Sequence, residues 1–170
     1  MNIKPSEQDG FLVIKRYRFI PEFGIAHKTI IELEIYPNKI CVVSFYSNKR
    51  GKGKDKYKVR LNYGPGHIKS ILKSTLTAFF SLGKHEYAFV FSASNDLEGD
   101  KEYNDRYSAY QLFLEGNYLD FNDCYRIGSI SLNTHMIYHK NYEFKDEADL
   151  FYRDFEIKIE NENEESSDSK

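Results

Sequence analysis

The clearest structural pattern in the sequence lies in Thr29–Ser47, TIIELEIYPNKICVVSFYS. Its first half alternates apolar side chains with Glu32 and Glu34, as a strand with one face in a core does. Pro37-Asn38-Lys39 then supplies turn-forming residues, and a second β-branched run, Ile40–Ser47, follows at once. Two strands joined by so short a connection pair in an antiparallel way, so we expect a β-hairpin.

The other regular elements are expected from the same hydrophobic periods. A strand precedes the hairpin, because Arg16-Tyr17-Arg18-Phe19 alternates charged and apolar residues. After the hairpin comes an irregular stretch, which Gly64-Pro65-Gly66 ends. A helical pattern of apolar residues begins there. The expected elements are strands over 11–20, 29–36, 40–47, 87–91 and 129–139, and helices over 67–82, 100–115 and 146–158. A strand over 155–159 is the alternative ending for the last helix, and Asn133-Thr134 is expected to form either a kink or a hairpin tip within 129–139.

The order β-β-β-α-β-α-β-α predicts an α+β fold. Three strands come before the first helix, so we expect an antiparallel or mixed sheet with the helices packed on one face. The length of 170 residues favours one domain. We expect a loose N-terminal lead-in over 1–10, a single domain over 11–159 and an acidic disordered tail over 160–170.

Composition places the chain among cytoplasmic globular proteins. It is 41% apolar and 29% charged, and no apolar run approaches the roughly 20 residues of a membrane helix. The first ten residues contain no apolar signal region. Cys41 lies in an apolar run and is expected in the core, and with Cys124 it makes no disulfide framework. We therefore expect no membrane association.

Charge is distributed unevenly along the chain. Residues 1–63 carry 13 Lys and Arg against 6 Asp and Glu, whereas residues 143–170 carry 4 against 11. A basic stretch with glycines and tyrosines suits single-stranded nucleic acid, because cations neutralise phosphates and aromatic rings stack on bases. The alternative is a solvated extension of the hairpin, which the net charge of −2 favours. The candidate nucleic-acid residues are Lys49, Arg50, Lys52, Lys54, Lys56, Tyr57, Lys58 and Arg60.

No sequence motif predicts a catalytic residue, a bound metal or a cofactor. Carboxylates cluster over 96–106, where a metal-dependent nuclease or hydrolase would place them, although helix capping explains Asp96 and Asp100 equally well. His135 and His139 share one face if their segment is a strand, but no second ligand cluster accompanies them.

The second expected helix carries a stripe of tyrosines. Tyr103, Tyr107 and Tyr110 fall at helical spacing, with Arg106 among them. Core packing is the simplest explanation, but Tyr and Arg are also the residues enriched at protein-binding hot spots. These four residues are therefore the candidate protein-binding surface.

Four further motifs carry a resemblance. They are Ser70-Ile71-Leu72 with Phe79-Phe80, Tyr87-Ala88-Phe89-Val90-Phe91, Asn104-Asp105-Arg106-Tyr107-Ser108-Ala109-Tyr110, and Met136-Ile137-Tyr138-His139-Lys140-Asn141-Tyr142. Over about residues 68–155, half of the chain, the sequence resembles small bacterial domain families of unknown function. The resemblance implies an α+β fold and no particular activity.

Three functions follow as hypotheses. The leading one is a non-enzymatic module that binds a protein partner or a second copy of itself through the sheet and the second helix. The others are a nucleic-acid-binding accessory protein that uses 49–60, and a nuclease or hydrolase that uses the 96–106 carboxylates.

Overall fold

The structure is a computed structural model that describes residues 2–3, 10–19, 29–47, 65–83, 85–93, 105–117 and 121–167. Its strands are β1 (Asn2–Ile3), β2 (Val13–Phe19), β3 (Thr29–Tyr36), β4 (Ile40–Ser47), β5 (Ala88–Ser92), β6 (Cys124–Ser129) and β7 (Thr134–His139). Its helices are α1 (Pro65–Gly83), α2 (Asp105–Asn117) and α3 (Lys145–Ser167), with short 3-10 turns η1 (Pro37–Lys39) and η3 (Phe121–Asp123).

The seven strands form one sheet in the order β1-β2-β3-β4-β5-β7-β6. Neighbouring strands are antiparallel except β4 and β5, which are parallel and are joined through α1. A parallel pair needs such a crossover, because a tight turn joins only antiparallel strands. The mixed sheet and the α+β class predicted from the sequence are both confirmed.

The predicted antiparallel hairpin of β3 and β4 is confirmed. Tyr36 lies opposite Ile40, so only residues 37–39 connect the strands. Asn38 takes the left-handed backbone conformation, with φ at 60°, which Asn tolerates better than most residues. The Tyr142 hydroxyl donates to the Asn38 carbonyl, so the turn is held from the far end of the chain.

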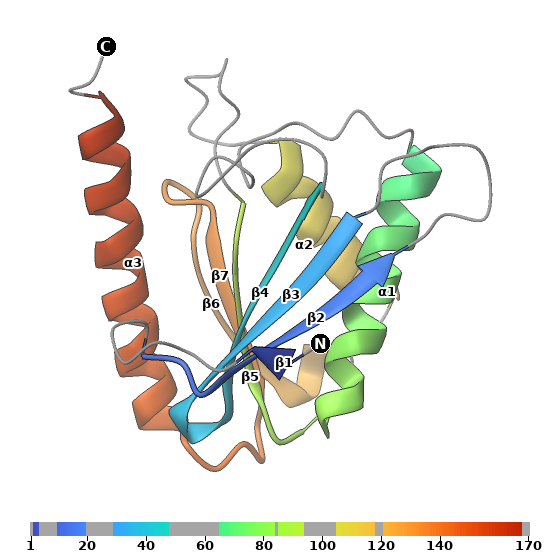
Figure 1. Cartoon of the computed structure of the whole chain (residues 1–170). Coiled ribbons are helices and arrows are strands. Elements are labelled where there is room, and N and C mark those ends of the chain that lie inside the picture. The colour runs from blue at the N-terminus through green and yellow to red at the C-terminus, as the bar shows by residue number, and fades with distance from the viewer. Residues whose placement is uncertain are drawn as a thin grey trace.

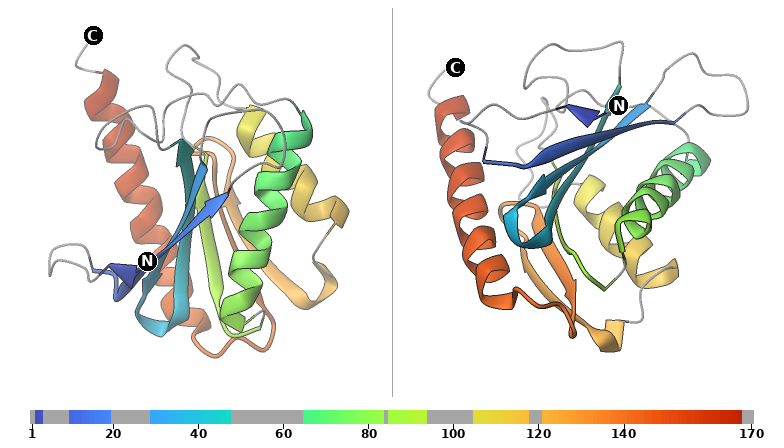
Figure 2. Two further views of the ribbon diagram at one scale, coloured as in Figure 1. Left: turned by 45° about the vertical axis from the view of Figure 1, so that its right-hand side comes forward. Right: turned by 60° about the horizontal axis from the view of Figure 1, so that its bottom comes forward.

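The helices cover both faces of the sheet, so the predicted packing on one face is wrong. α3 lies against one face and α1 and α2 lie against the other (Figures 1 and 2). The central strands carry apolar side chains in both directions: Ile40 contacts the α3 side, and its neighbour Cys41 contacts the α1 side. Strands buried on both faces read as continuous apolar runs, and the run Ile40-Cys41-Val42-Val43 is one.

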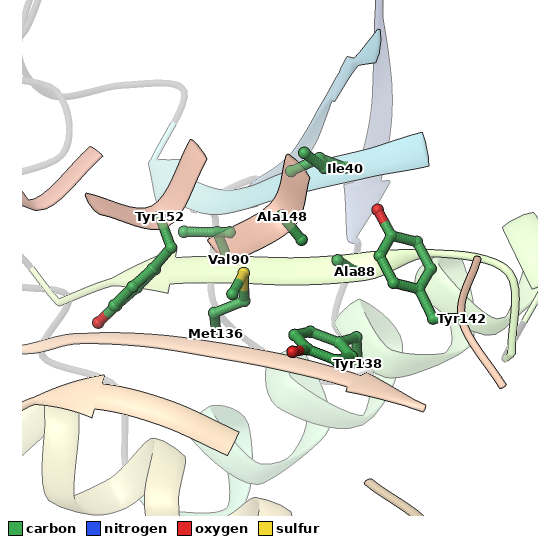
Figure 3. Packing of buried hydrophobic residues seen from close by; sticks show 8 residues of the cluster. All are labelled: Ile40, Ala88, Val90, Met136, Tyr138, Tyr142, Ala148 and Tyr152. Carbon is green, nitrogen blue, oxygen red and sulfur yellow. The ribbon is translucent and has the colours of Figure 1, made fainter. Parts of the chain in front are cut away.

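The larger core cluster joins α3 to β4, β5 and β7 (Figure 3). Ala148 and Tyr152 of α3 are almost fully buried against Ile40, Val90 and Met136. The Tyr152 hydroxyl lies 2.8 Å from the Thr134 hydroxyl, which satisfies both buried oxygens. A smaller cluster, formed by Ile31, Leu33, Cys41 and Ala78, lies under α1.

Two boundaries differ from the sequence predictions, and the structure decides two alternatives that the sequence left open. Of the kink and the hairpin tip expected at Asn133-Thr134, the structure has the hairpin, since β6 ends at Ser129 and β7 begins at Thr134. The backbone turns there through Asn133, whose φ is 52°. Residues 160–167 belong to α3 where a disordered tail was predicted, and the last element is helix rather than strand. Residues 2–3 pair with β2, so this part of the lead-in is ordered in the sheet.

In the described part of the chain, no helix is both long and apolar enough to cross a membrane.

Candidate functional site

The basic stretch lies outside the described residues. This applies to all of its predicted nucleic-acid ligands, Lys49, Arg50, Lys52, Lys54, Lys56, Tyr57, Lys58 and Arg60. It also applies to Tyr103 and to the carboxylates of residues 96–102. The predictions that rest on these residues therefore stay predictions.

The tyrosine stripe of α2 faces the sheet. Tyr107 is buried, and Tyr110 packs edge-on against Phe45 and Phe91, with ring centroids 5.6 Å apart in each pair. Tyr107 is thus a core residue, as the core-packing interpretation of the stripe predicts, and the protein-binding role of the stripe stays a prediction. The apolar face of α2 packs on the sheet because it covers the aromatic side chains of β4 and β5. Arg106 lies in the first turn of α2.

Beneath α2 the structure brings together a polar group, here called the His135 cluster: Gln111, Glu115, Arg126 and His135. Arg126 of β6 donates from Nη2 to Gln111 Oε1 at 2.9 Å and to Glu115 Oε1 at 3.1 Å. Gln111 Nε2 lies 2.9 Å from His135 Nδ1. The three elements α2, β6 and β7 meet here, which no sequence spacing indicated.

This chain of contacts fixes the protonation of His135. A guanidinium only donates, so Gln111 must turn its oxygen to Arg126 and its NH₂ group to the imidazole. His135 Nδ1 is therefore an acceptor, and the single proton of the neutral ring sits on Nε2. Burial, helped by the nearby Arg126 charge, lowers the pKa of His135 to about 4 and keeps the ring neutral.

The Nε2–H group of His135 has no hydrogen-bond acceptor among the described residues, although the side chain is only 5% exposed. The ring is flanked by Phe91, with centroids 5.4 Å apart, and by Tyr107, at 6.4 Å. A buried donor without a partner costs about 1–3 kcal/mol. This is the least satisfied polar group in the described interior.

Gly128 makes room for the His135 ring. A Cβ at Gly128 would lie 2.5 Å from His135 Nδ1, 3.1 Å from the Tyr107 hydroxyl and 3.2 Å from the Thr134 carbonyl oxygen. A glycine inside a strand often marks such a close approach. Gly128 was not singled out from the sequence, although a glycine within a strand is the signal that could have indicated this close approach.

His139, the second histidine of β7, belongs to a different group. It shares a face with His135, as expected for a strand, but four residues separate the two by roughly 13 Å. Its ring lies against the His85 ring, with centroids 4.1 Å apart and the planes tilted by 58°, and its Nδ1 accepts the Asn141 backbone N–H. Within the described ranges, no three His, Cys, Asp or Glu side chains lie close enough together to hold a metal ion.

The α3 side of the sheet also contains a buried ion pair. Glu32 is 1% exposed and pairs with Arg16 of the neighbouring strand. The Tyr46 hydroxyl donates to the same Glu32 oxygen at 3.3 Å. Burial, together with the Glu32 charge, raises the pKa of Tyr46. These contacts satisfy the carboxylate and tie β2, β3 and β4 together.

The side of α3 that faces away from the sheet is the second surface of interest. Leu150 and Ile157 are 61% and 55% exposed, whereas Ala148 and Tyr152 on the opposite side are almost fully buried. We call Leu150, Ile157 and the exposed charged residues around them, Asp146, Arg153 and Asp154, the outer face of α3. In Figure 1 the last turns of this helix rise beyond the ends of the strands.

Comparison of the chain with protein-family models, with curated proteins and with solved structures found no match. The resemblance of residues 68–155 to bacterial domain families therefore stays a prediction, and the geometry alone supports the proposals below.

Proposed function

We propose that this chain is a non-enzymatic, cytoplasmic protein-binding module, and that its partner docks on the outer face of α3. The observation that carries the proposal is that α3 has apolar residues on two opposite sides. One side packs into the core, and the other holds Leu150 and Ile157 in solvent.

The two exposed side chains are aligned. Seven residues are about two helical turns, so Leu150 and Ile157 project from the same side of α3, about 10 Å apart. Burying one such side chain contributes about 1.5–3 kcal/mol. A single exposed leucine is ordinary, but an aligned pair on a helix of 23 residues presents the spacing that a groove or a second helix recognises.

The charged residues of α3 indicate which kind of partner its outer face would bind. The exposed ionised groups of α3 include Asp146, Glu147, Asp154 and Glu160 against Arg153 and Lys158. Acidic side chains continue along its sequence, and its last turn has no basic residue to complement the negative end of the helix dipole. A partner with an apolar contact surface bordered by lysine or arginine fits this face. A second copy would bring two acidic surfaces together, which disfavours self-association.

Site-specific photocrosslinking tests the proposal. Benzoylphenylalanine replaces Leu150 or Ile157 in the cells from which the protein comes, and the matched control replaces Leu112, which is 69% exposed on α2. We expect one discrete crosslinked protein from both α3 positions and none from the control. Equal products from all three positions, or none from α3, would remove the proposal. A product with twice the mass of the chain would show self-association instead of a basic partner.

Each of the two alternative functions is tested by a separate set of substitutions. Replacing the six lysines and arginines from Lys49 to Lys58 with neutral residues should abolish binding of single-stranded RNA or DNA if the chain is a nucleic-acid accessory protein. Replacing Asp96, Asp100 and Asp105 with Asn should abolish activity if it is a hydrolase. Neither group of substitutions changes the outer face of α3, so these experiments distinguish the three functions from one another.

A further inference from the structure

The outer face of α3 is a narrow stripe in which charged residues separate two apolar side chains. Leu150 and Ile157 are 61% and 55% exposed, and Arg153 and Asp154, halfway between them, are exposed as well. With about 3.6 residues per turn, these four side chains project from α3 within a sector of about 100°. A partner that touches both apolar residues therefore also meets the charged pair.

The spacing of the apolar residues fits a second helix better than an extended strand. Helices that pack along each other meet at positions that recur every 3.5 residues or so, and Leu150 and Ile157 are two such repeats apart. Their separation along α3 is about 10 Å. Side chains on one side of a strand recur every two residues, about 6.6 Å, so no two of them match that separation.

The charged pair also argues against a closed groove as the partner surface. A helix that lies in a hydrophobic groove presents apolar anchors at the third and fourth positions after the first anchor, as well as at the seventh. In α3 the third and fourth positions after Leu150 are Arg153 and Asp154. A groove would bury both charges, which is costly, whereas a single helix leaves their ionised groups at the edge of the contact.

The charge at the end of α3 favours one direction of the partner helix. The last turn of α3 contains no basic residue, and the exposed Glu160 lies in its C-terminal half, where the helix dipole is negative. An antiparallel partner helix places its positive N-terminal end beside this negative end. A parallel partner would place its own negative C-terminal end there.

We propose that the segment bound by the outer face of α3 is a single amphipathic helix of the partner, antiparallel to α3. This helix has two apolar residues seven positions apart and a lysine or arginine that faces Asp154. The inference rests on the proposed function, because it describes the partner segment that docks on that same face.

Mass spectrometry of the crosslinked products tests the direction and form of the partner segment. Benzoylphenylalanine replaces Leu150 in one sample of the full chain and Ile157 in another, and the partner residue captured by each is identified. We expect the residue captured from Ile157 to precede the residue captured from Leu150 by about seven positions, because both helices rise by about 1.5 Å per residue.

Other spacings would overturn the inference. Captured residues about three positions apart would indicate an extended segment, and the reverse order would indicate a parallel helix. Captured residues from separate segments would indicate a groove, and captured residues of this chain would indicate a second copy. Each of these results leaves the outer face of α3 as an interface, whereas the absence of any product from both positions would remove the proposed function as well.

The variant Asp154→Lys tests the cation that faces Asp154. The affinity of the captured partner, measured by titration calorimetry, should fall at least about tenfold, because two positive charges would then meet. Glu143→Lys makes the same change of charge at an exposed position before α3 and should leave the affinity unchanged. Equal affinities for both variants and the wild type would overturn the assigned charge pairing.

Discussion

Acidification from pH 7 to pH 4 should destabilise this protein through His135. The ring is neutral in the folded state because burial, the Arg126 charge and the donor Gln111 all oppose a second proton. In the unfolded chain the same residue takes up its proton near pH 6.5. Below that pH the unfolded state binds more protons than the folded state, so the free energy of unfolding falls as the pH falls.

The magnitude follows from the two pKa values. The pKa of His135 is lowered from 6.5 to about 4, and each unit corresponds to about 1.36 kcal/mol. The full loss is therefore about 3 kcal/mol near pH 4, of which about 2 kcal/mol is lost by pH 5. This is a large fraction of the roughly 5–15 kcal/mol that stabilises a typical domain.

Urea unfolding at half-unit steps from pH 7 to pH 4.5 measures this loss. Carboxylates also titrate toward the acid end, so the quantity that isolates His135 is the difference between the wild type and His135→Asn. The variant is less stable at pH 7, but that deficit should shrink by about 2 kcal/mol at pH 5, because Asn does not titrate. A deficit that is the same at both pH values would refute the protonation state assigned to His135.

Three further outcomes are expected. Gly128→Ala should lower the free energy of unfolding by about 2 kcal/mol in urea, because the new Cβ would lie 2.5 Å from His135 Nδ1; an unchanged midpoint would contradict the close approach. Arg16→Met should lower the free energy of unfolding by about 3 kcal/mol, because the buried Glu32 carboxylate loses the cation that it pairs with. The double variant Arg16→Met with Glu32→Gln should recover part of that free energy, whereas additive losses from the two substitutions would contradict a coupled pair. The Cys41 thiol, whose pKa is raised to about 12 by burial, should resist alkylation at pH 8 until urea unfolds the chain; rapid reaction of the folded protein would place it outside the core.

The elements with a clear period were predictable from the sequence. Thr29–Ser47 yielded its hairpin because alternation and a short turn specify register locally. The run around Cys41 also held the information that both faces are covered, but an apolar run does not say which helix packs on which side. That choice depends on where the crossover through α1 leads the chain. Residues 160–170 were predicted to be disordered because this acidic stretch has no apolar side chains to bury, yet α3 continues as far as Ser167.

The His135 cluster shows why sites escape sequence reading. His135 was noticed beside His139 as a possible metal ligand, but its partners Gln111 and Arg126 come from other elements and stand in no motif with it. Only the packing of α2 on β6 and β7 brings them within 3 Å of one another. The outer face of α3 was missed for a different reason: an exposed Leu150 looks in sequence like one more core position of an amphipathic helix.

The most direct test of the proposed function uses the protein captured by crosslinking. Its affinity is measured by titration calorimetry for the wild type, for Leu150→Ser with Ile157→Ser, and for the matched Leu112→Ser. Two lost apolar contacts should weaken binding by at least about tenfold in the α3 variant and leave the Leu112 variant unchanged. Equal affinities for all three proteins would show that the partner binds elsewhere and that the outer face of α3 is ordinary solvent-exposed surface.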